Sequence, residues 1–302
     1  MFFINIFKRV MRFVFSSNSK KTESIAWNQR ERDASTESIE SDTAYAMKIG
    51  IQYLSLLNAL EIPIPGKKIV ELGPGHNYGS VAILACFGAN VAVADRFNVP
   101  WSNNYHGKFY KRLAELVKLE WPEVSTTPID DIIHANRHDV TVTELRSSAE
   151  DLHGISSDCF DIVFSNAVLE HLFNPKTALE SLYKITAPDG IGLHQVDFRD
   201  HRDFEKPLEY LLLPEAEFNV MFHEQHCECG NQTRPSELLE LFACVGFDLI
   251  KYEPNMFAKD SYLNEFVPIL RSSDSRYKNC AVDELRIISG HYTIKKPTQV
   301  QL

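Results

Sequence analysis

The sequence KKIVELGPGHNYGSVAILACFGANVAVAD, residues 67–95, decides the fold of this 302-residue chain. It starts with a short apolar run, passes through a loop with three glycines, continues in a second apolar run and closes with VAVAD. Short apolar runs separated by glycine-rich punctuation predict a strand, a loop, a helix and a second strand. We therefore expect a β-α-β unit whose second strand ends at Asp95.

The same alternation continues on both sides of this unit. An apolar stripe at helical spacing runs through residues 34–60, and Pro63 and Pro65 end it. Alternating strands and helices predict a mostly parallel sheet covered on both faces, so we expect a Rossmann-like, doubly wound α/β fold. Further helices are expected at 105–121, 175–187 and 235–243, and further strands within 139–146, 159–166, 190–196, 246–252 and 285–294.

Composition excludes some functions. The formal net charge of -10 argues against a general nucleic-acid binder, which needs basic surface to displace counterions from phosphates. No apolar run reaches the length that spans a bilayer. The six cysteines are scattered; Cys86 and Cys244 sit inside apolar stretches and Cys159 precedes a strand, as reduced structural thiols do, and this favours a cytoplasmic protein. They are Cys86, Cys159, Cys227, Cys229, Cys244 and Cys280.

The sequence divides into a short N-terminal segment and one domain. Residues 1–33 form an amphipathic segment, MFFINIFKRVMRFVF, followed by a polar linker, and residues 34–302 form one domain. The stretch 197–234 lacks a clear period and is expected to be an insertion that covers the substrate. Residues 1–15 combine apolar and basic side chains, so we expect them to pack on their own domain or on a twin subunit, with peripheral membrane contact as the alternative.

The glycine loop restricts the ligand. Glu71 opens the pattern E-x-G-x-G-x-x-x-G, whereas the dinucleotide fingerprint would need glycine at Tyr78 and a Walker loop would need G-K-[ST]. Pyrophosphate requires the close helix N-terminus that a third glycine allows, so the loop favours a ligand without phosphates. Asp95 stands where a carboxylate accepts hydrogen bonds from ribose hydroxyls. Together these residues predict a nucleoside-type ligand.

Four motifs carry a family resemblance. VELGPGHNYG, VADRF, SSAEDL and CFDIVFSNAVLEHL, followed by a helix and PDG, resemble class I S-adenosylmethionine-dependent methyltransferases. The resemblance covers 67–200 in detail. It implies a seven-stranded sheet with an antiparallel final strand, S-adenosylmethionine as the cofactor, and methyl transfer as the activity. Glu71, Gly73 and Gly75 would line the methionine part of the cofactor, and Asp95 would hold the ribose.

The adenine side of the cofactor is where this sequence departs from the family. The family has an acidic residue that reaches the adenine amine, and Ser148 stands at that place. Ala149 would offer its backbone and Glu150 would take over from the missing acid. Asn166, just beyond the fourth strand, would lie near the methionine or the acceptor.

Candidate catalytic residues follow strands four and five, because ligands of open α/β sheets bind at the carboxyl ends of the strands. Glu170-His171 is expected to open a helix, and Asp197 and His201 follow the strand that contains His194. Histidine titrates near neutrality, so Asp197, His201 or His171 would assist deprotonation of the acceptor. The spacing H-x-x-D-x-x-x-H leaves a divalent ion open as an alternative, but no third ligand is evident and we expect no metal.

The acceptor itself is only weakly indicated. The stretch 194–212 resembles a bacterial subgroup associated with surface polysaccharides, which implies O-methylation of a glycan hydroxyl, with a small molecule or an amine as the alternative acceptor. Arg199, Arg202 and Arg234 would meet such an acceptor or pair with nearby acids. His223–Cys229 also invites a zinc interpretation, but its C-x-C spacing favours a substrate-covering loop. A non-catalytic cofactor-binding scaffold is the remaining alternative, favoured by Ser148.

Overall fold

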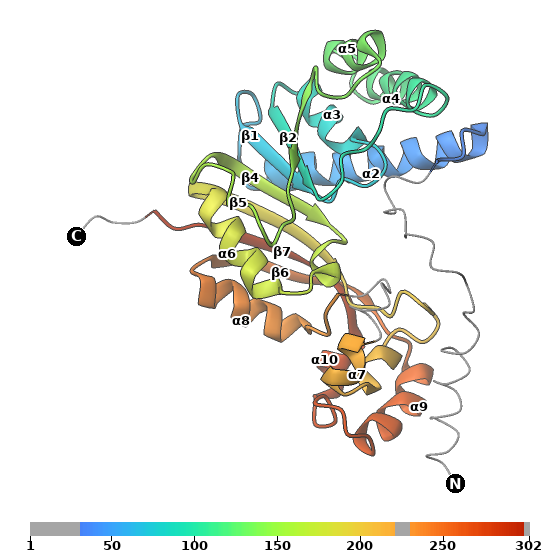
Figure 1. The fold of residues 1–302 in the computed structure, drawn as a ribbon, viewed down its shortest axis with the longest axis vertical. Helices are drawn as coiled ribbons and strands as arrows, with labels where there is room; N and C mark the ends of the chain where they lie inside the picture. Colours follow the sequence, from blue (N-terminus) through green and yellow to red (C-terminus); the bar gives the residue numbers. More distant parts are fainter. Residues whose placement is uncertain (1–30, 221–229, 299–302) are drawn as a thin grey trace.

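The computed structural model describes residues 31–220 and 230–298, and its centre is one seven-stranded sheet (Figure 1). The strand order is β3-β2-β1-β4-β5-β7-β6. The first five strands in that order pair in parallel, and β7 runs antiparallel to both of its neighbours. This confirms the predicted doubly wound fold with a reversed final strand. The strands are β1 (Lys68–Leu72), β2 (Asn90–Asp95), β3 (Val142–Arg146), β4 (Phe160–Asn166), β5 (Thr186–Asp197), β6 (Asp248–Phe257) and β7 (Ile287–Lys295).

One face of the sheet packs against the helices that precede β3. Side chains that alternate along the strands, such as Ile69, Val91 and Phe164, join this layer in one buried cluster. The alternation follows from the strand period of two residues, which sends successive side chains to opposite faces. The helices of this layer are α2 (Thr36–Ala59), α3 (Gly79–Cys86), α4 (His106–Glu120) and α5 (Thr127–Ala135).

The opposite face packs against α6 (Pro175–Ile185) and α8 (Pro235–Val245). Val70, Ala92 and Val163, the strand neighbours of the residues on the first face, lie in this second cluster. Each helix begins with proline at its first position, and α8 ends at Gly246 in the left-handed conformation. Burial on both faces explains why the strands read as continuous apolar runs.

A third buried cluster lies beyond the carboxyl end of β5, where Figure 1 shows α7, α9 and α10 grouped together. Leu211 and Phe218 from the insertion after β5 pack there with Phe266 and Leu285. The insertion therefore shares its core with the connection between β6 and β7, which the sequence pattern did not indicate. The elements are the 3-10 helix η3 (Glu209–Leu212), α7 (Glu215–Asn219), α9 (Asp260–Arg271) and α10 (Val282–Arg286).

One sequence-based expectation about a helix was wrong in detail, and two helices were not expected at all. Glu170-His171 forms the 3-10 turn η2 (Leu169–His171), and the following helix begins only at Pro175. Helices α5 and α9 were not expected, because α5 is short and α9 contains Pro268, which ordinarily ends a helix. No helix among residues 31–220 and 230–298 is both long and apolar enough to cross a membrane. The expectations for residues 1–15 and for the zinc interpretation of His223–Cys229 lie outside the described residues.

Candidate functional site

The glycine loop turns tightly between β1 and α3. Gly73 and Gly75 have φ values of +56° and +80°, which L-residues with a Cβ rarely adopt. A Cβ on Gly73 would lie 2.8 Å from Cγ2 of Val168, which follows β4. The loop therefore brings its backbone to the carboxyl edge of the sheet where side chains would block it, as a ligand held through backbone groups requires.

Glu71 lies beneath this loop and is 4% exposed. Its carboxylate accepts hydrogen bonds from Tyr53 Oη at 3.3 Å and from Ser80 Oγ at 2.5 Å. Burial raises the pKa of Glu71 to about 7, although both hydrogen bonds oppose the shift. A nearby cation stabilises the ionised form of a buried carboxyl. The cofactor that the family resemblance implies, S-adenosylmethionine, carries a positively charged sulfur. The residues of the loop thus fit that cofactor.

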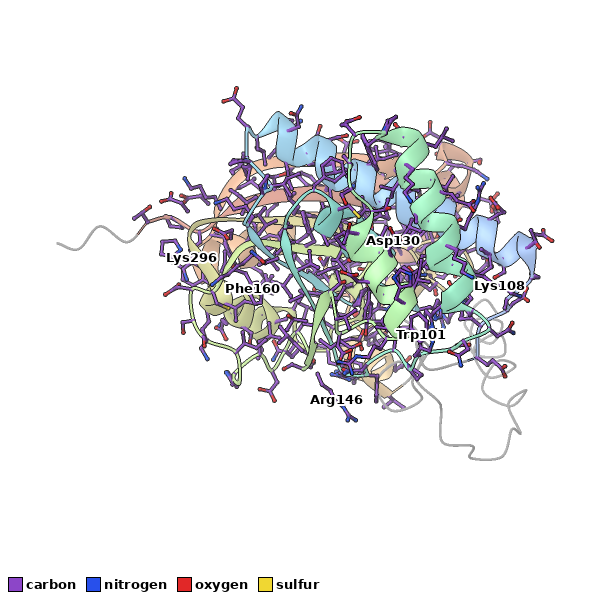
Figure 2. The ribbon with its side chains drawn as sticks, turned by 90° about the horizontal axis from the view of Figure 1, so that it is seen from above. Trp101, Lys108, Asp130, Arg146, Phe160 and Lys296 are labelled. Atoms are coloured by element: carbon purple, nitrogen blue, oxygen red, sulfur yellow. The ribbon has the colours of Figure 1, made fainter. Side chains whose placement is uncertain are left out.

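Tyr78 occupies the place where a dinucleotide loop has its third glycine. The side chain is buried, and its hydroxyl accepts a hydrogen bond at 3.1 Å from Val99 N in the loop after β2. The Tyr78 backbone N in turn donates to the hydroxyl of Tyr110, which also contacts His138. Trp101, labelled in Figure 2 beside the helices that carry Lys108 and Asp130, completes this aromatic group by packing on His138. Tyr78 therefore couples the glycine loop to the loop that follows Asp95.

Asp95 ends β2, directly across the sheet edge from the glycine loop. Its Oδ1 accepts a hydrogen bond from Phe97 N at 2.9 Å, and Gly73 N donates to the carbonyl of the preceding residue, Ala94, at 2.9 Å. The loop after β3 adjoins it, because Ser147 N donates to the Asp95 carbonyl at 2.8 Å. The structure thus brings together the residues predicted for the methionine part and for the ribose.

The adenine-side candidates lie in that loop after β3. Ala149 is buried, and Ser148 accepts a hydrogen bond from Glu150 N at 3.2 Å. Glu150 forms an ion pair with Arg96 at 3.0 Å and accepts a hydrogen bond from Asn174 N at 2.7 Å. Each of its carboxylate oxygens is thus engaged in joining two loops, so Ser148 and the Ala149 backbone offer the freer polar groups on this side.

Asn166 ends β4, the strand that pairs with β1. Its Nδ2 donates to the hydroxyl of Tyr45 at 2.6 Å, and Tyr45 comes from α2 with an exposed fraction of 55%. Sequence reasoning missed Tyr45, because 121 positions separate it from Asn166 and nothing in its local pattern marks it. Its exposure beside Asn166 is the only sign of a role, and this sign exists only in three dimensions.

The catalytic candidates from strand five form an ion-pair group. Arg199 binds both carboxylate oxygens of Asp197, with its Nη2 2.6 Å from Oδ2 and its Nε 2.9 Å from Oδ1. His201 Nε2 lies 3.8 Å from Asp197 Oδ2. Asp197 is 9% exposed, and Arg199 stacks its guanidinium 4.2 Å from the ring centre of Phe204.

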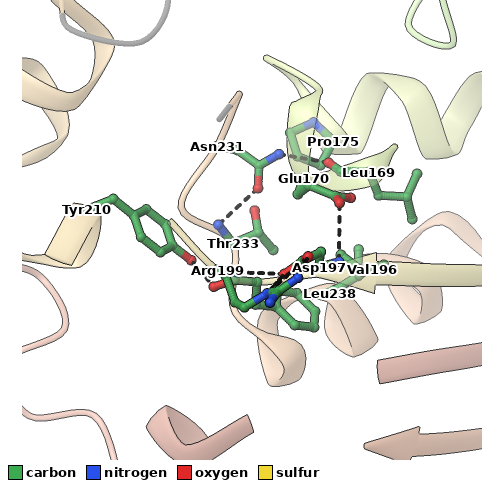
Figure 3. Close-up of a pocket in the computed structure, with 11 residues that line it drawn as sticks. Leu169, Glu170, Pro175, Val196, Asp197, Arg199, Tyr210, Asn231, Thr233 and Leu238 are labelled. Carbon is green, nitrogen blue, oxygen red and sulfur yellow. Dashed lines mark hydrogen bonds and ion pairs between the residues drawn. The ribbon is translucent and has the colours of Figure 1, made fainter. Parts of the chain in front are cut away.

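Residues of η2 reach the same place from β4, the neighbouring strand. The Glu170 Oε1 accepts a hydrogen bond from the backbone N of Asp197 at 3.3 Å, drawn as a dashed line in Figure 3. Burial raises the pKa of Glu170 well above its usual range. The ring of His171 lies 4.9 Å from that of His201. The structure therefore brings His171, Asp197 and His201 together, and it adds Glu170, which was not a predicted catalytic residue.

A pocket opens between these side chains and the loop before α8 (Figure 3). Asn231 holds η2 from one side, since its Nδ2 donates to the carbonyls of Leu169 at 2.9 Å and Leu172 at 2.8 Å. The remaining lining mixes polar and apolar groups, so the pocket can accept hydrogen bonds and donate them. It is formed by Leu169, Glu170, Pro175, Val196, Asp197, Phe198, Arg199, Tyr210, Asn231, Thr233 and Leu238.

Two other polar residues of this region are structural. The Nδ1 of His194 lies 2.7 Å from Ser165 Oγ on β4, and its ring stacks on Phe242 of α8; burial lowers its pKa to about 3. Arg234 is 1% exposed and donates to the carbonyls of Glu284 and Ile287, so the suggestion that it meets an acceptor was wrong. Its guanidinium instead ties α8 to the start of β7.

Comparisons with known proteins found a matching family model and similar solved structures. The model of a family described as a methyltransferase domain matches residues 41–252. No curated protein matches the chain. Among solved structures, an S-adenosylmethionine-dependent methyltransferase from Mesorhizobium loti is 13% identical, with a TM-score of 0.43 over 80% of this chain and 96% of that one. Phosphoethanolamine N-methyltransferase 2 from Haemonchus contortus is 15% identical, with a TM-score of 0.45 over 82% of this chain and 52% of that one.

Proposed function

The chain belongs to this methyltransferase family, and from that premise we propose that it methylates a hydroxyl group of a sugar or surface glycan. Membership confirms the predicted enzyme class and its cofactor, S-adenosylmethionine. The proposal concerns the acceptor. It is carried by one observation, the meeting of Glu170, His171, Asp197 and His201 beside a pocket at the carboxyl ends of β4 and β5.

The cofactor, when bound, supplies a methyl group on a positively charged sulfur. The acceptor oxygen forms the new bond to the methyl carbon while the carbon–sulfur bond breaks and its electron pair returns to sulfur. The protein must align the two reactants and accept the hydroxyl proton. In this proposal Asp197 or His201 receives that proton, and Arg199 supports the role by holding the Asp197 carboxylate in one orientation through two hydrogen bonds.

A hydroxyl acceptor explains the cluster better than an amine does. An alcohol is a weak nucleophile until a base removes its proton, whereas an amine that is already neutral carries a free electron pair. The pocket lining also includes the hydroxyl groups of Thr233 and Tyr210, whose oxygens can accept hydrogen bonds from a sugar hydroxyl. This inventory supports a polyhydroxylated acceptor.

Mass spectrometry after incubation with cofactor tests the proposal. Candidate glycans, lipid-linked sugars, simple amines and small metabolites are offered separately, and the expected result is the mass gain of one methyl group on a sugar hydroxyl. A matched pair of variants makes the test specific: His201→Ala should lose turnover, and His134→Ala, an exposed histidine on α5, should keep it. Methylation of amines alone would overturn the proposed acceptor class without affecting the enzyme class.

A further inference from the structure

We propose that Glu170, His171 and His201 form a binding site for a divalent first-row metal ion. Each residue offers one ligand atom, and these atoms lie within 4.8 Å of one another. Two imidazoles and one carboxylate make the ligand set of catalytic zinc sites that keep a position open for substrate. This set departs from the sequence-based expectation of no metal, and it leaves out His194 of the H-x-x-D-x-x-x-H spacing, which lies against Ser165.

Two unsatisfied atoms point to a missing ligand. Glu170 is 5% exposed, and its Oε2 has no hydrogen-bond partner among the described residues. The Nε2 of His201 is likewise buried without a hydrogen bond in the described part of the chain. A buried polar atom without a partner costs on the order of 1–3 kcal/mol, so two such atoms side by side are unusual. A metal ion would satisfy both.

The backbone holds the ligands in place before any ion binds. Glu170 and His171 lie on η2, where Gly230 N donates to the Glu170 carbonyl at 2.9 Å. A Cβ on Gly230 would lie 2.1 Å from the His171 carbonyl oxygen, so only glycine fits this close approach. His201 follows Asp200, which is 1% exposed and is bound by Arg202 at 2.6 Å. Ligands on such supported turns are what a metal site needs.

The three ligand atoms, which lie within 4.8 Å of one another, are spaced more widely than they would be around a bound ion. Ligand atoms around a tetrahedral ion with bonds of about 2.1 Å lie about 3.4 Å apart. His171 is exposed, so its side chain is not held by core packing and can rotate toward an ion. Asp197 Oδ2, 3.8 Å from His201 Nε2, adds a second carboxylate that offsets the charge of the ion.

The position suggests a role that rests on the proposed function. An ion with an open position at the pocket would bind the acceptor hydroxyl and lower its pKa, as metal ions do for bound water. The proton would then pass to Asp197 or to solvent, because His171 and His201 would be occupied by the ion. Binding of the ion itself does not depend on which acceptor the enzyme uses.

The test is metal content of the full chain. Protein stripped with chelator and dialysed is incubated with Zn²⁺, and in parallel with Mn²⁺, and the bound metal is measured by mass spectrometry. We expect one ion per chain, and affinity reduced at least about tenfold in Glu170→Gln and in the double variant His171→Ala/His201→Ala. His134→Ala is the matched control, and Cys227→Ser/Cys229→Ser separates this site from the His223–Cys229 motif.

Two results would overturn the site: no ion bound, or an ion lost in the cysteine variant and retained in the Glu170 and histidine variants. Cofactor binding measured by calorimetry confirms that each variant is folded. Zn²⁺ should also raise the unfolding temperature of the unsubstituted chain and not that of the double variant. If the ion binds but no hydroxyl acceptor is methylated, the site stands and the proposed acceptor falls.

Discussion

The Glu71 carboxylate accepts a hydrogen bond of 2.5 Å from Ser80 Oγ, so the end of the first strand and the first turn of α3 are joined beneath the glycine loop. A second hydrogen bond comes from Tyr53 on α2, whose ring stacks 3.9 Å from that of Phe164. The carboxyl group is therefore held rigidly at the place where the cationic cofactor binds in our proposal. The position of the Glu71 carboxyl is thus fixed, whereas its protonation state can change with pH.

We expect cofactor affinity to rise with pH because of Glu71. Burial raises the pKa of its carboxyl to about 7, so the group is largely protonated at pH 6 and ionised at pH 8. A cationic ligand favours the ionised form, so affinity should increase up to tenfold per pH unit below pH 7 and level off above it. Calorimetry at pH 6, 7 and 8 measures this, and Glu71→Gln should show a flat profile. An equal slope in that variant would assign the titration to another group.

Substitutions at Asp95 and at His201 should affect different quantities, cofactor affinity in the first case and turnover in the second. Asp95→Ala removes an acceptor of ribose hydrogen bonds, and affinity for S-adenosylhomocysteine should fall by about 10- to 100-fold, as expected for hydrogen bonds to a charged group. His201→Ala should keep that affinity and lose turnover. Calorimetry and product formation on both variants check this. Equal loss of affinity in both would remove His201 from the acceptor side of the site.

Gly73→Ala should impair both stability and cofactor binding. The φ of +56° costs an L-residue about 1–2 kcal/mol, and the new Cβ would lie 2.8 Å from Val168 Cγ2. Gly107→Ala is the matched control, because Gly107 lies in α4 with no neighbour within 4 Å, and alanine there should stabilise the helix by up to about 1 kcal/mol. Urea unfolding of the two variants gives the comparison. Similar stability in both would mean that the glycine loop relaxes freely.

Two buried histidines should weaken the fold in acid. Burial lowers the pKa of His138 and of His194 to about 3, against about 6.5 in the unfolded chain. The unfolded state therefore binds more protons between pH 6.5 and 3. Stability is full above pH 6.5 and falls with pH below it, by up to about 1.4 kcal/mol per pH unit for each histidine.

The variant His194→Gln tests this linkage, since it removes one titrating group from the core. Its free energy of unfolding should be lower at pH 7, because the contacts of His194 with Ser165 and Phe242 are lost, but it should depend less steeply on pH between 6.5 and 4. Urea unfolding at pH 7, 6 and 5 measures both effects, with His134→Gln as the exposed control. An unchanged slope would show that His194 does not control the acid transition.

The order of elements and the cofactor class followed from the sequence. Strand and helix periods are properties of neighbouring residues, so residues 67–95 indicated the β-α-β unit, and Tyr78 excluded a dinucleotide before any contact was known. What Tyr78 does instead could not be inferred. Its hydrogen bonds to Val99 and Tyr110 join segments that become neighbours only when β2 and α4 pack beside the loop.

The acceptor side of the site was decided by the tertiary structure. His194 and His201 come from the same short stretch of sequence, yet one is buried against Ser165 and the other lies beside His171. This difference arises because β4 and β5 are neighbours in the sheet, so η2 and the end of β5 meet at one edge. Local pattern determines which residues form a strand or a loop, but only strand order and packing determine which distant side chains share a site.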